Sequence, residues 1–329
     1  MTMEQRDWAG VFSAITTPFA TDLSVDHGFL REHVTWLVDS GCTGIVALGS
    51  LGESATLSFD EKVAILESCR SAVGGRVPVV AGIAGLSTAE CVALARRAAA
   101  VGCDGLMVLP AYVYRGDWRE TEAHFSGIIE ATPLSCMLYN NPIAYGTDVT
   151  AEQLTELARH DNLHAVKESS GDVRRVTAVI ERLGERLNVF AGLDDMIVES
   201  VAMGASGWIA GLVNALPEES VRLFDLARAG RTREARTLYE WFLPLLRLDT
   251  LPKFVQLIKL AQVAVGKGSA RVRPPRLEVV GAEYDEAMAL IRERLAARPP
   301  ASASADGALA GVRSTAPARG ALQGDALAR

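Results

Sequence analysis

Residues 77–109 read VPVVAGIAGLSTAECVALARRAAAVGCDGLMVL, and their pattern is that of a strand, a helix and a second strand. The first apolar run, 77–82, is short and is followed by Ser87, a residue type that favours helix N-caps. Residues 88–101 then carry the periodicity of an amphipathic helix, and a second apolar run follows at 105–109. This alternation predicts a βα unit that leads into a parallel strand.

The same alternation extends over most of the chain. We predict eight strands, at residues 11–16, 44–48, 77–82, 105–109, 134–139, 163–167, 188–191 and 207–210. Most of these runs are apolar throughout, which is typical of parallel strands that helices cover on the outside. Eight βα units in series predict an α/β fold, a closed (β/α)8 TIM barrel over residues 11–229. The alternative is an open doubly wound sheet, but the G-x-G-x-x-G signature that marks its dinucleotide-binding form is absent after the first strand.

The two ends of the chain lie outside this repeat. Residues 1–10 form a short N-terminal extension. Residues 230–298 hold three further helical stretches, which we interpret as a C-terminal helical extension, either an appended domain or a layer for subunit contacts. Residues 299–329 are rich in Ala, Gly, Ser and Arg without apolar periodicity, and they predict a disordered tail.

Composition excludes several classes of protein. The chain is 49% hydrophobic and has a net charge of −7, whereas a nucleic-acid surface needs a concentrated basic patch. Its five cysteines are scattered, with none at C-x-x-C spacing, so a disulfide framework is not expected. No basic segment with a following apolar run opens the chain, and no apolar stretch reaches the ~18 residues that a membrane span needs. We therefore expect a cytoplasmic protein without nucleic-acid or membrane partners.

Lys167 is the most informative single residue. It ends the apolar run 163–166, and it is one of only five lysines among 33 basic residues. Burial disfavours the ammonium form, and lowering its pKa by about 3 units raises the neutral fraction several hundredfold. A neutral amine at the carboxyl end of a barrel strand could form an imine with a substrate carbonyl. The alternative interpretation is a buried lysine that pairs with Glu168 or Asp194.

Two further strand ends could serve the same chemistry. Tyr139 ends the neighbouring strand, so its phenol could shuttle protons to and from Lys167, although taken alone this tyrosine more often caps the core. The turn Gly49-Ser50-Leu51-Gly52 offers backbone N–H groups that could hold a carboxylate, but many βα loops contain glycine.

A metal site is not expected. The five histidines show no H-x-x-x-H spacing with an accompanying Glu and no cysteine partners. Asp194 and Asp195 could bind a divalent ion, but we expect such a pair to cap the next helix instead.

In this order, the strand ends resemble the dihydrodipicolinate synthase / N-acetylneuraminate lyase superfamily over roughly residues 11–297. The likeness is carried by Gly-Ser-Leu-Gly-Glu at 49–53, Tyr-Asn-x-Pro at 139–142 and Lys-Glu-Ser at 167–169. The resemblance implies a Schiff-base enzyme without cofactor or metal, with Lys167 as the Schiff-base lysine and Tyr139 as the proton shuttle. It also implies that Ser50 links this tyrosine to Tyr112, which family members reach across a dimer interface. Members are commonly homotetramers built as dimers of dimers.

The resemblance also implies a set of substrate contacts at the carboxyl ends of the strands. The expected contacts are Gly49, Ser50, Leu51, Asn141, Ser169, Gly192 and Ile209. The substrate would be a small 2-oxo acid or cyclic imino acid.

Two departures separate the chain from the synthase branch of the superfamily. Leu51 stands where that branch usually has a second threonine. Ala144 stands where that branch places an arginine for the carboxylate of a second substrate. The combination of Gly-Ser-Leu-Gly-Glu at 49–53, Tyr-Asn-Asn-Pro-x-x-Tyr at 139–145 and Arg-Val-Arg-Pro-Pro-Arg at 271–276 is most similar to 1-pyrroline-4-hydroxy-2-carboxylate deaminases of hydroxyproline degradation. This resemblance implies a deaminase that yields 2,5-dioxopentanoate and ammonia.

Two alternatives stay open at this point. One is an aldolase, lyase or dehydratase that uses the same imine on a 2-keto-3-deoxy sugar acid or on 4-hydroxy-2-oxoglutarate. The other is a barrel that binds a 2-oxo acid as a sensor without turnover.

Overall fold

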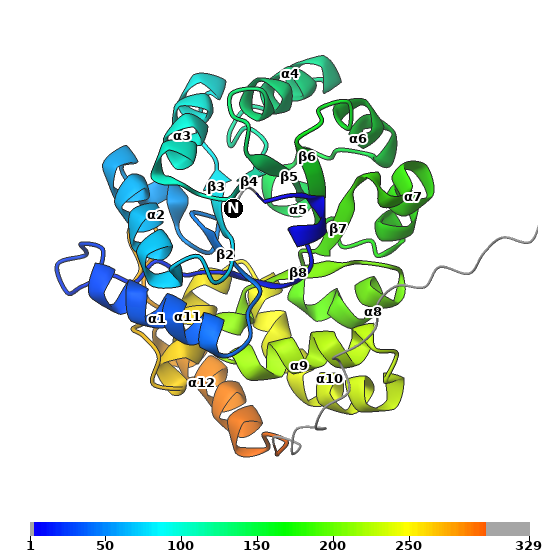
Figure 1. The fold of residues 1–329 in the computed structure, drawn as a ribbon. Coiled ribbons are helices and arrows are strands. Elements are labelled where there is room, and N and C mark those ends of the chain that lie inside the picture. The colour runs from blue at the N-terminus through cyan, green and yellow to red at the C-terminus, as the bar shows by residue number, and fades with distance from the viewer. Residues whose placement is uncertain (1–2, 301–329) are drawn as a thin grey trace, which may run out of the picture. The chain divides into compact units, whose positions relative to one another are not determined.

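Eight parallel strands close into a barrel in the order β1 to β8, with helices in a ring around it (Figure 1). The computed structural model describes residues 3–300. The strands are β1 (Gly10–Ala14), β2 (Gly44–Ala47), β3 (Val79–Ile83), β4 (Gly105–Val108), β5 (Ser135–Asn140), β6 (Leu163–Glu168), β7 (Asn188–Ala191) and β8 (Gly207–Ala210). Parallel pairing of β1 with β8 closes the sheet, so the predicted TIM barrel is confirmed and the open doubly wound alternative is wrong.

The bounds of β7 and β8 are as predicted, and the bounds of the other six strands differ from the predicted ones by one or two residues. Strand β3 begins at Val79 rather than at residue 77, because Pro78 has no N–H to donate to a sheet. Strands β5 and β6 each continue one residue further than predicted. Tyr139 and Lys167 are therefore paired residues inside the sheet, directly opposite each other in register.

Helices follow the strands as the alternating pattern predicts. They are α1 (His27–Asp39), α2 (Phe59–Val73), α3 (Thr88–Val101), α4 (Trp118–Ile129), α5 (Pro142–Tyr145), α6 (Ala151–Leu157), α7 (Arg174–Leu183), α8 (Ile197–Ala202), α9 (Pro217–Arg228), α10 (Thr232–Leu246), α11 (Phe254–Ala264) and α12 (Gly281–Ala296). Short 3-10 turns also occur, among them η1 (Gln5–Asp7), η2 (Ser54–Thr56), η4 (Asp194–Met196), η5 (Leu212–Asn214) and η6 (Arg247–Thr250). Ser87 caps α3 as predicted, since its hydroxyl accepts a hydrogen bond from the backbone N–H of Glu90.

Aromatic side chains fill the amino-terminal end of the barrel. The rings of Phe12 and Phe190 pack edge to face with their centroids 5.2 Å apart, and Trp8 stacks on Phe12 and packs edge to face against Phe190. Gly44 makes room for this layer, because a Cβ atom there would lie 2.6 Å from the ring of Phe12. This end is thus solid core, and open space inside the barrel is left to the carboxyl-terminal end.

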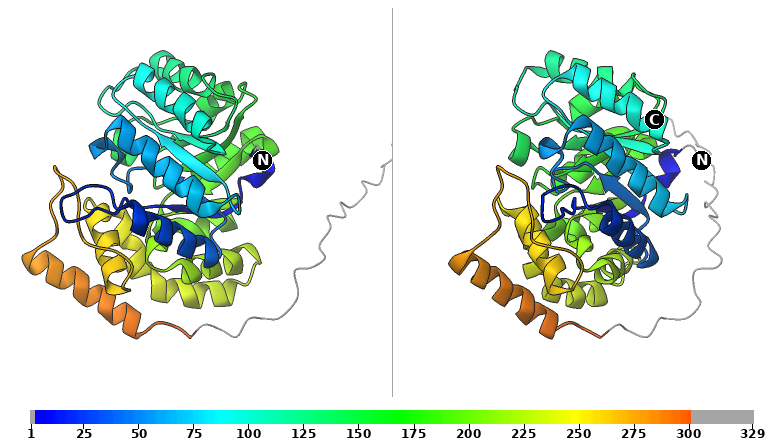
Figure 2. Two further views of the ribbon diagram at one scale, coloured as in Figure 1. Left: turned by 60° about the vertical axis from the view of Figure 1, so that its left-hand side comes forward. Right: turned by 90° about the vertical axis from the view of Figure 1, so that its left-hand side faces the viewer.

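The C-terminal helices pack against the barrel within one compact unit that extends to Ala297. Figure 2 shows α12 as the outermost helix of this part, where Trp241 of α10 donates a hydrogen bond to the carbonyl of Arg294. Between α10 and α11 the chain turns back through η6 towards the barrel mouth. The predicted domain limits at residues 10, 229 and 298 stay predictions. The predicted tail lies, apart from residues 299 and 300, outside the described residues.

Candidate active site

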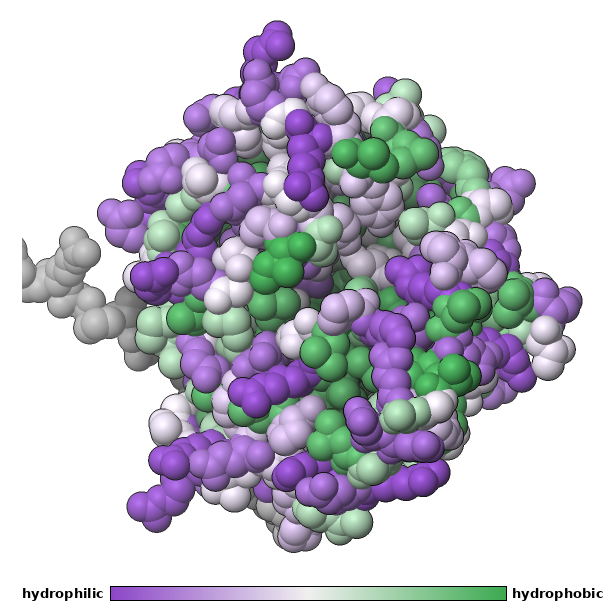
Figure 3. Space-filling view, turned by 180° about the vertical axis from the view of Figure 1, so that it is seen from behind, coloured by the Kyte–Doolittle hydropathy of each residue, from purple (hydrophilic) through white to green (hydrophobic). Residues whose placement is uncertain are grey.

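A cavity of about 660 Å³ opens at the carboxyl ends of the strands. Its volume is in the range of small-molecule sites. Figure 3 shows this face of the molecule, opposite to the face seen in Figure 1, with a hollow near its centre and hydrophobic groups around it. Walls come from the loops after the strands and also from the segment 249–254 and Arg276, which belong to the C-terminal part of the chain.

The structure brings nine of the ten predicted site residues into the lining of this cavity. These are Gly49, Ser50, Leu51, Tyr112, Tyr139, Asn141, Lys167, Gly192 and Ile209. The tenth, Ser169, is buried beside the cavity, where its hydroxyl lies against Gly192. Gly192 is required at its place, because a Cβ atom there would lie 2.8 Å from Cε of Lys167. The roles predicted for these residues stay predictions.

Lys167 reaches the cavity from β6 as a buried amine without a close partner. Its Nζ lies 4.2 Å from the centroid of the Tyr139 ring, and it forms no ion pair or hydrogen bond with the residues that the structure describes. Glu168, one of the two expected partners, instead accepts hydrogen bonds from Asn140 and from the backbone N–H of Ser170. Burial lowers the pKa of Lys167 to about 8, against the opposing charges of Asp249 and Asp194.

The lowered pKa leads to a prediction about pH. The rate of imine formation with a low concentration of pyruvate is expected to rise about tenfold per pH unit up to pH 8 and then to level off, because only the neutral amine attacks. An ordinary lysine would still gain rate up to pH ~10. Initial rates of borohydride-trapped adduct between pH 6 and pH 10 measure this. A rate that climbs without a break to pH 10 would contradict the lowered pKa.

Tyr139 is buried, and polar groups surround its phenol. The amide of Asn141 donates a hydrogen bond of 2.9 Å to the phenol oxygen. Burial raises the pKa of Tyr139, and the polar side chains of Asn141, Ser169 and Ser50 partly oppose this effect. The phenol therefore stays protonated at neutral pH, so it can donate a proton before it accepts one.

Removal of this hydroxyl gives a second prediction. Tyr139→Phe is expected to slow turnover by about 100-fold, which is typical of a lost acid–base group, while the purified variant keeps its fold. Tyr114→Phe is the matched control, since Tyr114 is an exposed tyrosine outside the cavity lining and donates a hydrogen bond to Glu120. The measurement is kcat for both variants beside circular dichroism. Equal kcat for the two variants would exclude a proton shuttle at residue 139.

The hydroxyl partner of Ser50 differs from the predicted one. Ser50 shares a short hydrogen bond with the phenol of Tyr145, which the sequence reasoning did not assign to the site. Asn141 caps the short helix α5 through the backbone N–H of Ala144, and this turn brings Tyr145 back over the cavity. Tyr112 stacks on Tyr145 with ring centroids 5.6 Å apart. Within the chain, then, Ser50 is linked to Tyr145, and the expected link from Ser50 to Tyr112 stays a prediction. An action of Tyr112 across a subunit contact stays a prediction.

The turn after β2 is held in a strained shape. Leu48 and Glu53, on either side of Gly49–Gly52, have positive φ angles of 64° and 54°, which cost about 1 kcal/mol or more each for such residues. Thr17 donates a hydrogen bond of 2.6 Å to the carbonyl of Gly52. The strain persists only because the surroundings enforce it, and so the candidate carboxylate turn is preformed.

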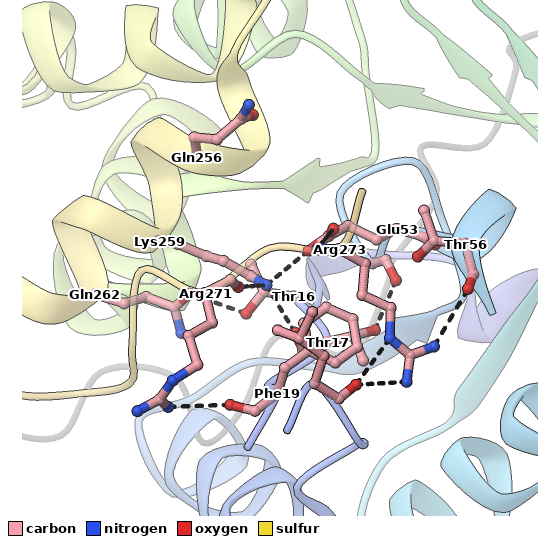
Figure 4. Close-up of polar contacts among 12 residues, drawn as sticks. Thr16, Thr17, Phe19, Glu53, Thr56, Gln256, Lys259, Gln262, Arg271 and Arg273 are labelled. Atoms are coloured by element: carbon pink, nitrogen blue, oxygen red, sulfur yellow. Dashed lines mark hydrogen bonds and ion pairs between the residues drawn. The ribbon is translucent and has the colours of Figure 1, made fainter. Parts of the chain in front are cut away.

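The main support of this turn is a buried ion pair, drawn in Figure 4. Nζ of Lys259 on α11 donates to the Glu53 carboxylate at 2.6 Å, and also to the carbonyls of Thr17 and Arg271. The second oxygen of Glu53 accepts a hydrogen bond from the backbone N–H of Arg273. The C-terminal segment thus fixes the β2 turn from behind.

Two aspartates lie near Lys167, and the structure corrects one expectation about them. Asp194 does not cap a helix. Its carboxylate accepts hydrogen bonds from Nε1 of Trp208 at 2.9 Å and from the backbone N–H groups of Gly211 and Leu212. Burial raises the pKa of Asp194 to about 6 against these donors. Asp249, which sequence reasoning missed, lines the cavity directly.

Arg276 is the other residue that sequence reasoning missed at this site, although its segment carried part of the resemblance. It lines the cavity, as Ala144 does. The strand ends gave no signal for Asp249 or Arg276, because both residues come from the segment beyond the eighth βα unit.

Residues 3–300 offer neither a metal site nor a membrane span. No three His, Cys, Asp or Glu side chains gather there as a group that could ligate a metal ion. In the same range, no helix combines the length and the apolar character that a bilayer crossing requires.

Comparisons with known proteins give one consistent result. The chain matches the Dihydrodipicolinate synthetase family over residues 7–294. It is 32% identical to a 4-hydroxy-tetrahydrodipicolinate synthase of Geotalea uraniireducens over 86% of this chain and 98% of the relative. A solved dihydrodipicolinate synthase of Bacillus anthracis superposes with a TM-score of 0.84 at 28% identity, covering 91% of this chain and all of that one. The dihydrodipicolinate synthase of Acinetobacter baumannii, solved with pyruvate, superposes with a TM-score of 0.83 at 27% identity, covering 88% and 99% of the two chains.

Proposed function

The chain belongs to the dihydrodipicolinate synthetase family, and from that premise we propose that it is a deaminase acting on 1-pyrroline-4-hydroxy-2-carboxylate. The resemblance to the superfamily is confirmed, and the chain is an enzyme of the lyase kind that acts on a small molecule. The sensor alternative is therefore wrong. The narrower resemblance to the deaminases is what the proposal adds.

One observation carries the proposal: a buried Lys167 amine that has no ion pair or hydrogen bond among residues 3–300 and lies beside the Tyr139 ring in a cavity at the carboxyl ends of the strands. An amine with a pKa of about 8 is partly neutral at physiological pH, and it can attack the C2 atom of a cyclic imine or a 2-oxo acid. The protonated imine that follows is an electron sink, so protons at C3 become removable.

In the proposed reaction, the bond to Lys167 assists two steps, the removal of a C3 proton and the loss of the C4 hydroxyl. Lys167 attacks C2, the ring nitrogen leaves, and a lysine-bound imine with a free amine at C5 results. Tyr139 or a nearby base removes a C3 proton to give an enamine, and the C4 hydroxyl departs as water. Tautomerisation converts the C5 amine to an imine, and its hydrolysis releases ammonia. A second hydrolysis releases 2,5-dioxopentanoate and restores Lys167.

The cavity lining supports this substrate over the synthase reaction. Ala144 and Leu51 line it where the synthase branch has an arginine and a threonine. The second candidate is nevertheless 4-hydroxy-tetrahydrodipicolinate synthase, because the relatives carry that name and Arg276 brings a guanidinium to the same lining. Family membership also supports a homotetramer, which we keep as part of the proposal.

The experiment compares three substrates with the purified enzyme. Ammonia and 2,5-dioxopentanoate are expected from 1-pyrroline-4-hydroxy-2-carboxylate, with no pyruvate. Release of pyruvate from a 2-keto-3-deoxy sugar acid or from 4-hydroxy-2-oxoglutarate, without ammonia from the pyrroline, would replace the deaminase by an aldolase. Consumption of pyruvate with aspartate semialdehyde would establish the synthase instead.

A further inference from the structure

We propose that Asp249 is the acid of this site and gives its proton to the C4 hydroxyl as that group leaves. The assignment rests on the proposed function, since it concerns the dehydration step of that reaction. Lys167 does not supply this proton, because it is bound to the substrate as an imine or enamine, and the other acid of the site, Tyr139, is assigned to the proton at C3.

The fold places the Asp249 carboxyl at the cavity by a specific route. Helix α10 ends at Leu246, and η6 carries Asp249 back over the end of β8. Gly211, which follows β8, leaves the space that this carboxyl fills, because a Cβ atom at residue 211 would collide with it. Asp249 then lines the same cavity as Lys167.

The hydrogen bonding of Asp249 is unlike that of its neighbour. Asp194 has three donors, and it is a carboxylate that the fold fully satisfies. The Oδ1 atom of Asp249 is shielded from solvent and has no hydrogen-bond partner among residues 3–300. A shielded polar atom without a partner lowers the stability of the fold. The presence of such an atom in Asp249 therefore indicates a functional role rather than a structural one.

The surroundings of Asp249 also favour its protonated form. Burial and the nearby charges of Asp194 and Asp195 raise the pKa of Asp249 well above its ordinary value, while the Lys167 ammonium opposes this. Once Lys167 is a neutral enamine, this opposing charge is gone. The Asp249 carboxyl is therefore protonated at the enamine stage, when the C4 hydroxyl leaves.

The proton and electron movements of the step balance. The nitrogen lone pair of the enamine forms the C2=N bond, the C2=C3 electrons form C3=C4, and the C4–O bond breaks with its electrons on oxygen. That oxygen takes the proton of Asp249 and leaves as water. A neutral acid and a neutral enamine thus become a carboxylate and an iminium, two opposite charges that stabilise each other in a site of low dielectric constant. The acid is restored when the carboxylate removes a proton from C5 in the tautomerisation.

The test uses Asp249→Asn, which keeps the shape of the side chain and loses the acid. Ammonia release from the pyrroline substrate is expected to fall by roughly 100- to 1,000-fold. Borohydride added during turnover is expected to trap a Lys167 adduct that still carries the C4 hydroxyl. The melting temperature is expected to stay or rise, since no hydrogen bond of Oδ1 is lost. Asp225→Asn, an exposed aspartate of α9, is the control and should release ammonia like the wild type.

A second variant separates an acid from a structural group. Asp249→Ala should lose the same activity and regain part of it when formate, a small carboxylic acid, is added. Rescue by formate is not expected of a residue that only shapes the cavity. Ammonia release by both variants at the wild-type rate would overturn the assignment of Asp249 alone. Absence of ammonia release by the wild type would overturn the proposed function and this assignment together.

Discussion

Lys167→Met abolishes turnover, by on the order of 10⁴-fold or more, and yields no borohydride-trapped adduct with pyruvate. This is the expected result because every proposed step passes through a covalent bond to Nζ, so the variant has no alternative route. A 10⁴-fold loss corresponds to about 5.5 kcal/mol of transition-state stabilisation. Methionine has a similar volume, so circular dichroism is expected to match that of the wild type.

Lys62→Met provides the matched control for this variant. Lys62 lies on α2 and is also buried, but it faces Glu90 and is not part of the cavity lining. Lys62→Met should turn over substrate at the wild-type rate, and it should still form the borohydride-trapped adduct on the peptide that contains Lys167. The Schiff-base mechanism would fail if Lys167→Met kept more than about 1% of the wild-type kcat.

The second large effect concerns stability. Lys259→Met is expected to lower the free energy of unfolding by roughly 3–5 kcal/mol, because it leaves the Glu53 carboxylate buried without its cation. Both side chains of this pair are almost completely inaccessible, at 2% and 0% exposure. A loss of this size is a large part of the ~5–15 kcal/mol by which a typical domain is stable. Urea unfolding measures it.

Two comparisons sharpen the stability prediction. Lys253→Met removes an ion pair with Glu283 in which both side chains are about half exposed, and it should cost less than ~1 kcal/mol. The double variant Glu53→Gln/Lys259→Met removes both charges, so it should be more stable than Lys259→Met. If Lys259→Met and Lys253→Met lowered the free energy of unfolding by similar amounts, the buried Glu53–Lys259 pair would contribute no more to stability than an exposed pair.

Lys259→Met also bears on function, through position rather than chemistry. Glu53 directly follows the strained turn that is the candidate carboxylate site (Figure 4). Loosening this turn should raise KM for a carboxylate substrate more than it lowers kcat. A larger effect on KM than on kcat would show that Lys259 positions the turn and takes no direct part in the reaction.

The sequence located Lys167 and Tyr139 at one rim, since both end apolar runs and parallel strands present their carboxyl ends on one side of a barrel. Their register, with the two residues directly opposite each other, follows from strand pairing that the runs did not specify. The strand limits also moved, as at Pro78, because backbone donors rather than hydrophobicity decide where a ladder begins.

The parts that sequence reasoning missed share one cause. Tyr145 reaches Ser50 because the Asn141-capped turn of α5 folds back over the cavity. Asp249 and Arg276 reach it because the C-terminal segment returns to the barrel mouth, where the sequence had suggested only an appended layer. Side chains from distant segments meet through packing, and no periodicity or spacing along the chain encodes such a meeting.

By itself, then, the sequence determined the closed barrel and placed the Lys167 amine at its carboxyl-terminal rim, because hydrophobic periodicity and chain direction are local properties. The tertiary structure alone decided which carboxyl groups and hydroxyls face that amine and how its pKa is lowered. Those features depend on burial and on contacts between segments far apart in the chain, and only the folded molecule has them.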